Sequence, residues 1–351
     1  MQNAIVFTHN LLADNFAKTA HGLLRGTERY NILAVIDSVH YGKDTGEVLE
    51  GNKINVPVYK TIAEFIDASD VQAECCIVGV AFPGGILPAE CRNELIEATK
   101  FKLSIVSGLH HYLSDDSDFI ALAEKYNVEL IDIRKPRSVS DLHFWSGKIL
   151  DINVPIVAVL GTDCAVGKRT TARLILENCI KEGIRTELIY TGQTGWMQGY
   201  KHGFIFDATP NDFVSGELER VILECVDQSN PDLILLEGQS SMRNPSGPGG
   251  SEFILSGNAK SVIIVHPIGR KYFVDLEEFE YEIPDLIDEI KLIESYGANI
   301  IGVGLNEENA TEDKLMKFRN KYSQLLEIPV VLPLTDGVGD IVKNIKENLS
   351  L

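Results

Sequence analysis

Short apolar runs alternate with amphipathic segments through the first part of the chain. The apolar runs cover residues 3–8, 30–37, 75–82, 102–108 and 128–134. They have the nearly continuous apolar character of strands that are buried on both faces. Between them, residues 14–26, 61–69 and 88–100 repeat apolar side chains at the spacing of a helix. This alternation is typical of βαβ units, so the pattern predicts a parallel sheet.

The same pattern returns in the second part of the chain. Apolar runs at residues 155–161, 185–192, 232–238, 261–267, 299–306 and 328–334 are expected to be strands, with helices between most of them. Residues 136–155 have weaker periodicity and are expected to connect two domains. A chain of 351 residues is longer than one ordinary core fills. We therefore predict two α/β domains, residues 1–150 and residues 151–351.

The stretch GTDCAVGKRTT, which follows the strand expected at residues 155–161, has the form of a phosphate-binding loop. Its glycines allow close approach of the backbone, and the start of the following helix adds partial positive charge. Lysine supplies a full positive charge. We expect the phosphates of a cofactor to be bound by Gly161, Thr162, Asp163, Cys164, Ala165, Val166, Gly167, Lys168, Arg169, Thr170 and Thr171.

Arg169 stands where a nucleotide-hydrolysing loop has a Ser or Thr that binds magnesium. An arginine cannot bind a cation, but its planar set of N–H donors suits phosphate or carboxylate. Two alternatives remain open. Either Thr170 takes over as magnesium ligand, or the loop binds a phosphorylated ligand without metal. Coenzyme A, which has a pyrophosphate and a ribose 3′-phosphate, fits the second alternative.

The segments GTDCAVGKRT, YTGQTG, LLEGQSS and GVGLN occur in the order found in dethiobiotin synthetase and its amidoligase relatives. Residues 155–351 therefore resemble that subclass of the P-loop NTPase-like fold. The resemblance implies that Glu237 helps to hold magnesium, if magnesium binds. It also places Asp163 and Thr191 where relatives have metal-facing or substrate-facing groups, and Gln193 in the same motif is a further candidate for substrate binding.

Three more side chains are candidates for chemistry. His110, at a strand end, is a candidate base, although a hydrogen-bonded structural histidine is the alternative. Arg134, at another strand end, either binds a substrate carboxylate or forms a salt bridge. Cys164 lies near a helix N-terminus that would lower its pKa, but a small residue filling the loop is the plainer interpretation.

Residues 238–252, rich in Gly, Ser and Pro, are either a surface loop or a substrate lid.

Composition and charge exclude several classes of protein. The formal net charge of −19 argues against a nucleic-acid partner. No apolar run approaches the ~18 residues of a membrane span, so no membrane partner is expected. Six cysteines without CxxC spacing favour a reducing cytoplasm over a disulfide framework or a zinc site. The first turn after a strand lacks GxGxxG, so a dinucleotide bound in the usual manner is not expected.

The stretches GVAFPGG, SGLHHYL, DIRKP, GTDCAVGKRTTA, TGQTGW and LLEGQSS together resemble a two-domain bacterial family that was long listed as of unknown function. The resemblance covers nearly the whole chain. It implies an N-terminal Rossmann-like domain followed by a P-loop NTPase-like domain. Some members of that family are D-glutamate N-acetyltransferases, which use acetyl-CoA.

The resemblance favours an acetyl-CoA-dependent N-acetyltransferase acting on D-glutamate or a similar acidic amino acid. Lys168 would bind the phosphates of the coenzyme, and Glu237 or His110 would take the proton of the amine. The alternatives are a ligase or kinase that uses ATP with magnesium, and a nucleotide-binding protein without catalysis. We expect a small-molecule substrate and a homo-oligomer.

Overall fold

The computed structural model describes residues 1–82, 85 and 87–351. The chain forms two compact units. The first contains Met1–Pro136 and Gly192–Tyr200, and the second contains Arg137–Thr191 and Lys201–Leu351. Residues 137–150, which the sequence analysis assigned to the first domain, thus belong with the second unit, and a short segment of the second half belongs with the first.

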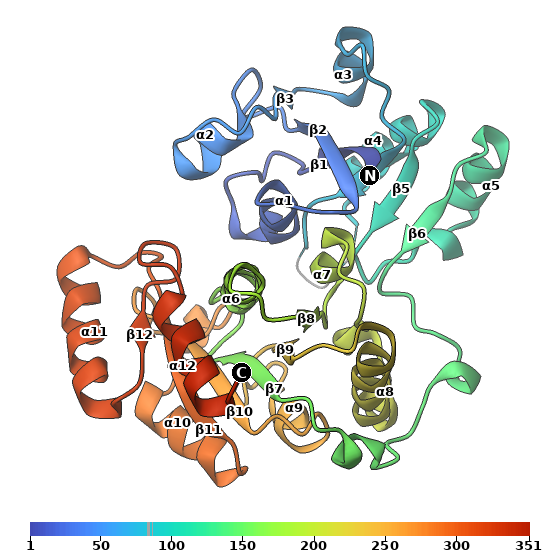
Figure 1. Cartoon of the computed structure of the whole chain (residues 1–351). Helices are drawn as coiled ribbons and strands as arrows, with labels where there is room; N and C mark the ends of the chain where they lie inside the picture. Colours follow the sequence, from blue (N-terminus) through green and yellow to red (C-terminus); the bar gives the residue numbers. More distant parts are fainter. Residues whose placement is uncertain (83–84, 86) are drawn as a thin grey trace. The chain divides into compact units, whose positions relative to one another are not determined.

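The first unit is built on a six-stranded sheet in which every strand pairs in parallel, in the order β3-β2-β1-β4-β5-β6 (Figure 1). This is the strand order of the Rossmann fold. All five strands expected from the sequence form, and β3 is an edge strand of two residues that the pattern did not reveal. The strands are β1 (Gln2–Phe7), β2 (Tyr30–Ile36), β3 (Val58–Tyr59), β4 (Cys75–Val78), β5 (Ser104–Ser107) and β6 (Leu130–Asp132).

The helices of the first unit include one from the second half of the chain. That helix is α7, and its Met197 is fully buried in the hydrophobic core of the first unit. The α-helices are α1 (Lys18–Leu24), α2 (Thr45–Glu50), α3 (Ile62–Ala68), α4 (Ala89–Lys100), α5 (Ser117–Tyr126) and α7 (Gln193–Gln198). Short 3-10 turns are η1 (Asn15–Ala17) and η3 (Leu113–Asp115).

The second unit also has a six-stranded, fully parallel sheet, in the order β12-β11-β10-β7-β9-β8. All six strands expected from the sequence are present. The last is much shorter than expected, because Pro329 and Pro333 flank it and lack the N–H that a sheet needs. The strands are β7 (Ile156–Gly161), β8 (Thr186–Ile189), β9 (Leu233–Glu237), β10 (Ser261–Pro267), β11 (Asn299–Asn306) and β12 (Val330–Val331).

Helices cover both faces of the second sheet (Figure 1). Helices α6 and α12 contact each other and the strands, whereas apolar side chains of α8–α11 pack in one cluster with alternate residues of β7, β9 and β10. The helices are α6 (Lys168–Lys181), α8 (Asn211–Ser229), α9 (Ser251–Leu255), α10 (Leu286–Ser295), α11 (Glu312–Leu326) and α12 (Gly339–Leu349). The 3-10 turns are η4 (Val139–Asp141), η5 (Lys148–Asp151), η6 (Phe206–Ala208) and η7 (Glu277–Phe279).

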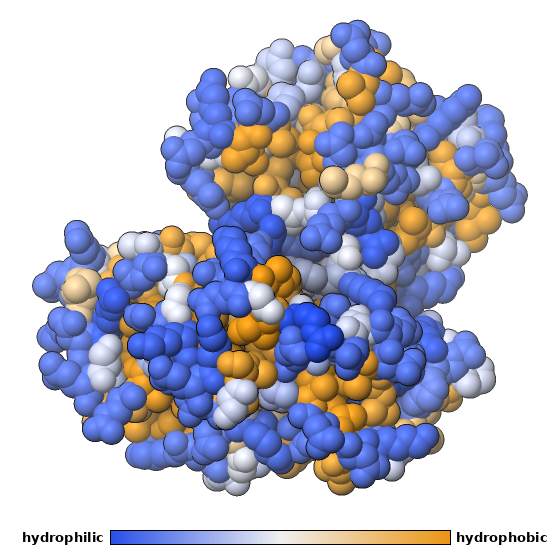
Figure 2. All heavy atoms as spheres, viewed as in Figure 1, coloured by the Kyte–Doolittle hydropathy of each residue, from blue (hydrophilic) through white to orange (hydrophobic). Residues whose placement is uncertain are grey.

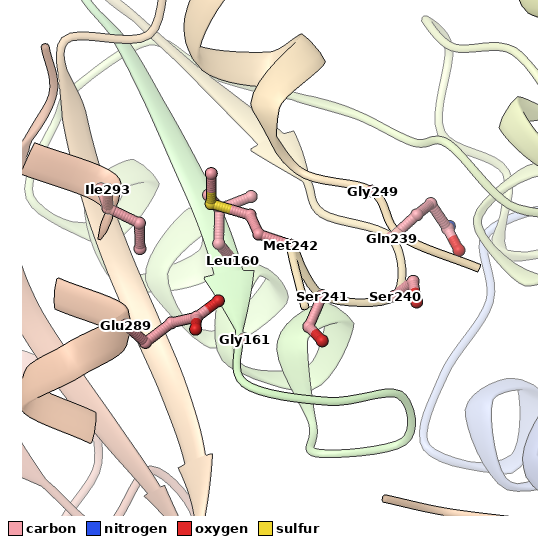
Figure 3. A pocket seen from close by; sticks show the side chains of 9 residues that line it. All are labelled: Leu160, Gly161, Gln239, Ser240, Ser241, Met242, Gly249, Glu289 and Ile293. Carbon is pink, nitrogen blue, oxygen red and sulfur yellow. The ribbon is translucent and has the colours of Figure 1, made fainter. Parts of the chain in front are cut away.

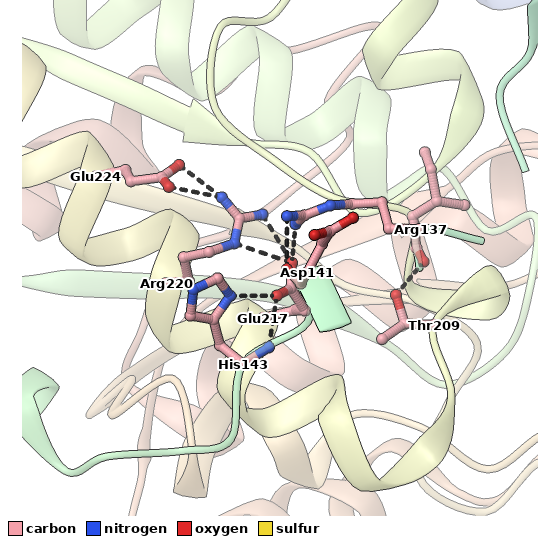
Figure 4. Close-up of polar contacts among 8 residues, drawn as sticks. Arg137, Asp141, His143, Thr209, Glu217, Arg220 and Glu224 are labelled. Carbon is pink, nitrogen blue, oxygen red and sulfur yellow. Dashed lines mark hydrogen bonds and ion pairs between the residues drawn. The ribbon is translucent and has the colours of Figure 1, made fainter. Parts of the chain in front are cut away.

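The segment before β7 is held to α8 by two buried glutamates. Glu217 accepts hydrogen bonds from Arg137 Nη1 at 2.8 Å and from the backbone N–H of His143 at 3.1 Å (Figure 4). Glu219 accepts hydrogen bonds from the N–H groups of Ser146 and Ile149. A stretch with little periodicity of its own is therefore anchored by side chains of a neighbouring helix.

Hydrophilic side chains cover most of the face seen in Figure 2, with hydrophobic ones exposed in small groups between them. The chain has 51 acidic and 32 basic residues, so the protein as a whole carries an excess of negative charge. None of the helices formed by the described residues is long and apolar enough to cross a membrane.

Candidate phosphate-binding site

The loop between β7 and α6 lies at the point of the second sheet where ligands are expected. The chain leaves β7 toward β8 on one side of the sheet and leaves β10 toward β11 on the other. In parallel α/β sheets ligands bind outside the carboxyl ends of two strands that diverge in this way. The expected phosphate loop, residues 162–167, follows β7 directly.

Two glycines give this loop its shape. Gly167 has a φ of +93°, a conformation that favours glycine, and it immediately precedes α6. A Cβ on Gly161 would lie 2.7 Å from Cγ2 of Val166, so a larger residue would push the loop open. The loop is also tied to β10, because Thr162 Oγ1 lies 2.9 Å from Nδ1 of the buried His266.

Lys168 is the first residue of α6, and its ammonium group is turned into the loop. Nζ donates hydrogen bonds to the carbonyl oxygens of Asp163, at 2.6 Å, and of Ser240, at 2.7 Å. The side chain is buried, and burial lowers the pKa of Lys168 from its usual value. An anion bound at this loop would therefore lie near a lysine that is poorly hydrated. Its attraction to the lysine would be stronger than in water, because the effective dielectric constant is lower there.

Asp163 joins three segments of the second unit. Its buried carboxylate accepts hydrogen bonds from the N–H of Cys164 at 2.6 Å, from Asn244 Nδ2 at 3.0 Å and from the N–H of Val274 at 2.8 Å. These contacts tie the phosphate loop to residues 238–252 and to the segment after β10. Asp163 therefore orders the protein around the loop, and its oxygens already have protein donors.

Glu237 ends β9 and lies beside the loop with Thr191 and Arg169. The N–H of Thr191 donates to Oε2 of Glu237 at 3.2 Å, and the Thr191 hydroxyl donates to the Glu237 carbonyl oxygen at 2.6 Å. The guanidinium Nη1 of Arg169 lies 3.8 Å from Oε1 of Glu237. Burial raises the pKa of Glu237 above its usual value, against the opposing effect of Arg169.

Glu237 and Thr170, which the sequence analysis assigned to magnesium if it binds, have the following surroundings. The carboxylate that the resemblance assigned to magnesium faces a permanent positive charge, that of Arg169. Thr170, the other expected magnesium ligand, is half-buried in the first turn of α6. The residues that the structure describes contain no group of three or more His, Cys, Asp or Glu side chains that could hold a metal ion.

The other expected site residues belong to the first unit. The N–H of His110 donates to the Gly85 carbonyl at 3.1 Å, and the residue is exposed. Arg134 donates to the carbonyl oxygen of Gly108, and Gln193 is buried against the same glycine. The structure thus groups His110, Arg134 and Gln193 together within one unit, and Lys168 and Glu237 within the other. In the GVAFPGG stretch, residues 83 and 84 lie outside the described residues, as does residue 86.

The segment after β9 contributes residues that the sequence analysis did not single out. Gln239, Ser240, Ser241, Met242 and Gly249 line a small pocket with Leu160 and Gly161 of β7 and with Glu289 and Ile293 of α10 (Figure 3). Glu289 is buried and pairs with Nε of Arg243 at 2.7 Å. The Ser and Gly content of this segment was the sequence signal, but it did not distinguish a lid from a surface loop.

Cys164 and Arg270 complete the loop surroundings. Cys164 is half-buried, and its sulfur lies 3.5 Å from Oγ of Ser240. Arg270, which follows β10, donates from Nη2 to the Cys164 carbonyl oxygen at 2.8 Å. No motif marks this arginine, because it reaches the loop only through the pairing of β10 with β7.

Comparisons with known proteins agree with this architecture. Residues 143–342 match the family model described as a domain of unknown function, DUF1611_C, P-loop domain, and residues 38–136 match DUF1611_N, a Rossmann-like domain. A crystal structure of a DUF1611 family protein from Anabaena variabilis superposes with a TM-score of 0.90 at 25% identity, covering 99% of this chain and all of that one.

Two curated relatives carry the name D-glutamate N-acetyltransferase. The protein from Pseudoalteromonas sp is 29% identical over 285 residues, which are 80% of this chain and 83% of the relative. The protein from Tritonibacter scottomollicae is 28% identical over 286 residues, 79% of this chain and 82% of the relative. With a Rossmann-like unit followed by a P-loop unit, the chain is a member of the DUF1611 family.

Proposed function

We propose that this protein transfers an acetyl group from acetyl-CoA to the amino group of D-glutamate or a similar acidic amino acid. One observation carries the proposal: at a loop built for phosphate, a guanidinium stands in place of the metal-binding hydroxyl, with Nη1 of Arg169 3.8 Å from Glu237. The name shared by two relatives that each match about four-fifths of the chain supplies the substrate class.

The phosphates of the coenzyme would lie against the start of α6. An anion is attracted there by the backbone N–H groups, by the partial positive charge of the helix N-terminus and by the ammonium group of Lys168. Arg169 adds N–H donors of the planar kind that suit phosphate oxygens. The resulting site needs no cation between protein and ligand.

The chemistry would be direct transfer. The free amine attacks the thioester carbonyl carbon, the resulting tetrahedral intermediate expels the thiolate of coenzyme A, and the nitrogen gives up a proton. Holding the amine and the thioester together supplies much of the rate, because it removes the entropic cost of their encounter. No covalent bond to Cys164 is required.

Glu237 is the proposed base, with His110 as the alternative. Its carboxylate is buried, and burial raises its pKa, which brings a carboxylate closer to the pH at which it works as a base. Its partners are Thr191, which hydrogen-bonds it, and Arg169, whose charge opposes the rise in its pKa.

Isothermal titration with acetyl-CoA, in excess EDTA and in millimolar magnesium, tests the coenzyme site. We expect the same affinity in both buffers and a decrease with added salt, because fixed charges contact phosphate. Replacing Arg169 with Ser should weaken binding by about 1.5–3 kcal/mol, the range of a charge-assisted hydrogen bond. Arg173→Ser, one turn further along α6 and paired with Glu177, is the matched control and should bind normally.

A second function is favoured by one feature, the buried Glu237 at the end of β9. In a ligase or kinase that uses ATP, this carboxylate would act at magnesium, as the resemblance to dethiobiotin synthetase implies. Tight, magnesium-dependent binding of ATP with no binding of acetyl-CoA would replace the acetyltransferase by that enzyme class. Release of coenzyme A thiol only when D-glutamate is added would support the transferase.

A further inference from the structure

Arg270 lies just after β10, the strand that pairs with β7 beside the phosphate loop. It follows β10, which pairs with β7 along five residues of each strand. Its guanidinium donates to the Cys164 carbonyl at 2.8 Å and lies 3.4 Å from Oδ2 of Asp163. The side chain is 22% exposed, so part of it remains open to a ligand.

Asp163 does not depend on Arg270 for its hydrogen bonds. The backbone N–H groups of Cys164 and Val274 and the amide of Asn244 already donate to its two oxygens. The 3.4 Å separation from Arg270 exceeds the ~2.7–2.9 Å of a direct charge-assisted hydrogen bond. Asp163 therefore acts as a nearby counter-charge, and among the described residues the Arg270 guanidinium donates one hydrogen bond, to the Cys164 carbonyl.

A guanidinium has five N–H donors, and Arg270 uses one of them on the Cys164 carbonyl. The remaining donors form a planar set that matches the two oxygens of a carboxylate. The local charge agrees with an anionic ligand, because Lys168, Arg169 and Arg270 surround the two carboxylates of Asp163 and Glu237. An acidic substrate approaching a chain of net charge −19 would need such a local excess of positive charge.

We propose that Arg270 binds a carboxylate of the amino-acid substrate. The inference rests on the proposed acetyltransferase and deepens it by naming the residue that selects an acidic acceptor. The phosphates of the coenzyme are left to Lys168 and the start of α6, while Arg270 reaches the loop at Cys164, on the side of β10. Arg270 is thus a specificity residue for the acceptor and not for the coenzyme.

Steady-state kinetics on Arg270→Gln and Arg270→Lys test this assignment. We expect the KM for D-glutamate to rise about thirtyfold in Arg270→Gln, the loss of a bidentate charged contact, while the KM for acetyl-CoA stays within about threefold. Arg270→Lys should recover little, because an ammonium cannot form the planar pair. Lys271→Gln, whose ammonium pairs with Glu282 at 2.8 Å, is the matched control and should behave as the wild type.

Two acceptor analogues identify which carboxylate is bound. D-glutamine lacks the side-chain carboxylate, and 4-aminobutanoate lacks the α-carboxylate. The analogue that lacks the group bound by Arg270 should be equally poor for the wild type and for Arg270→Gln. For the other analogue, the KM should rise in Arg270→Gln by the same factor as the KM for D-glutamate does.

Three outcomes would overturn the assignment. A rise in the KM for acetyl-CoA alone would mean that Arg270 binds coenzyme phosphate, and a rise in both would mean that it only braces the loop. No change in either would exclude it from the site. If the wild type releases no coenzyme A thiol, the proposed function fails, and equilibrium titration with D-glutamate then decides the assignment separately: binding must weaken in Arg270→Gln and not in Lys271→Gln.

Discussion

At the scale of single residues, Glu237 combines a cost in stability with its proposed role as a base. Its carboxylate is buried, and burial is the largest effect on its pKa, which it raises. A raised pKa means that the folded protein holds this proton more tightly than the unfolded chain does. The corresponding contribution to stability is therefore complete at low pH and lost as the pH rises through the raised pKa.

Glu237→Gln should accordingly be less active and more stable at neutral pH. Because Glu237 is the proposed base, the loss of its carboxylate should lower kcat about a hundredfold or more. The midpoint of thermal unfolding should exceed that of the wild type at pH 7, and this difference should shrink in acid, where the wild-type carboxyl takes up its proton. Lower stability at pH 7 would show that the pairing with Arg169 outweighs the cost of burial.

Ser241 is a second residue whose environment predicts an unusual mutant. Its hydroxyl is buried, the residue is 2% exposed, and the hydroxyl has no hydrogen-bond partner among the described residues. A buried hydroxyl without a partner lowers stability. Ser241→Ala should raise the free energy of unfolding by about 1 kcal/mol, measured by urea denaturation.

The control for Ser241 lies in the same segment. The Ser246 hydroxyl donates to Oδ1 of Asn244 at 2.7 Å, so Ser246→Ala should lower stability slightly. A loss of stability in Ser241→Ala as well would mean that its hydroxyl has a partner in solution.

At the scale of elements, α8 is the part of the second unit that holds an irregular segment in place. Burial alone would raise the pKa of Glu217, but hydrogen bonds from Arg220 and His143 lower it below its usual value (Figure 4). This carboxylate therefore stabilises the fold above the ordinary pKa of a glutamate, and the contribution is lost as the pH falls through the lowered value.

The backbone of α8 also approaches this segment closely. A Cβ on Gly216 would lie 1.9 Å from the carbonyl oxygen of His143. Alanine is the better helix former, but the clash is the larger effect, so Gly216→Ala should cost about 2 kcal/mol or more of stability. Gly339→Ala, at the start of α12 with no atom within 4 Å of the added carbon, is the control and should be neutral or stabilising in the same thermal unfolding assay.

At the scale of the whole molecule, the two parallel sheets differ in the residues that follow their strands. In the second unit, a glycine-bounded loop and Lys168 follow the central strand β7. In the first, the position after β2 that binds ribose in dinucleotide enzymes holds Asp37. Asp37 is 1% exposed and accepts hydrogen bonds from the Thr8 hydroxyl and the Leu12 N–H, so it ties the end of β2 to the segment after β1. The Asp37 carboxylate is therefore already hydrogen-bonded within the first unit.

The TGQTGW motif shows why sequence order does not settle which residues act together. Thr191 stays with the second unit, where it hydrogen-bonds Glu237. Gln193 and Met197, only a few residues later, belong to the first unit, where Met197 is in the core. A motif that resembles one substrate site is thus divided between two compact units, and the roles expected for Thr191 and Gln193 remain predictions.

The sequence by itself determined the two parallel sheets, eleven of whose strands it located, and the glycine-bounded loop between β7 and α6, whose phosphate binding stays a prediction. These features depend on the period of apolar residues and on glycines beside a lysine, which are local properties of the chain. The two-residue strand β3 was missed, because two residues are too few to show a period.

Only the tertiary structure decided what surrounds that loop. Arg270 reaches Cys164 because β10 pairs with β7, and Asn244 reaches Asp163 because the segment after β9 folds over the same edge. The partners are 106 and 81 residues apart in the chain. No pattern of apolar residues encodes such contacts, because strand order, and not sequence separation, brings the ends of parallel strands to one edge.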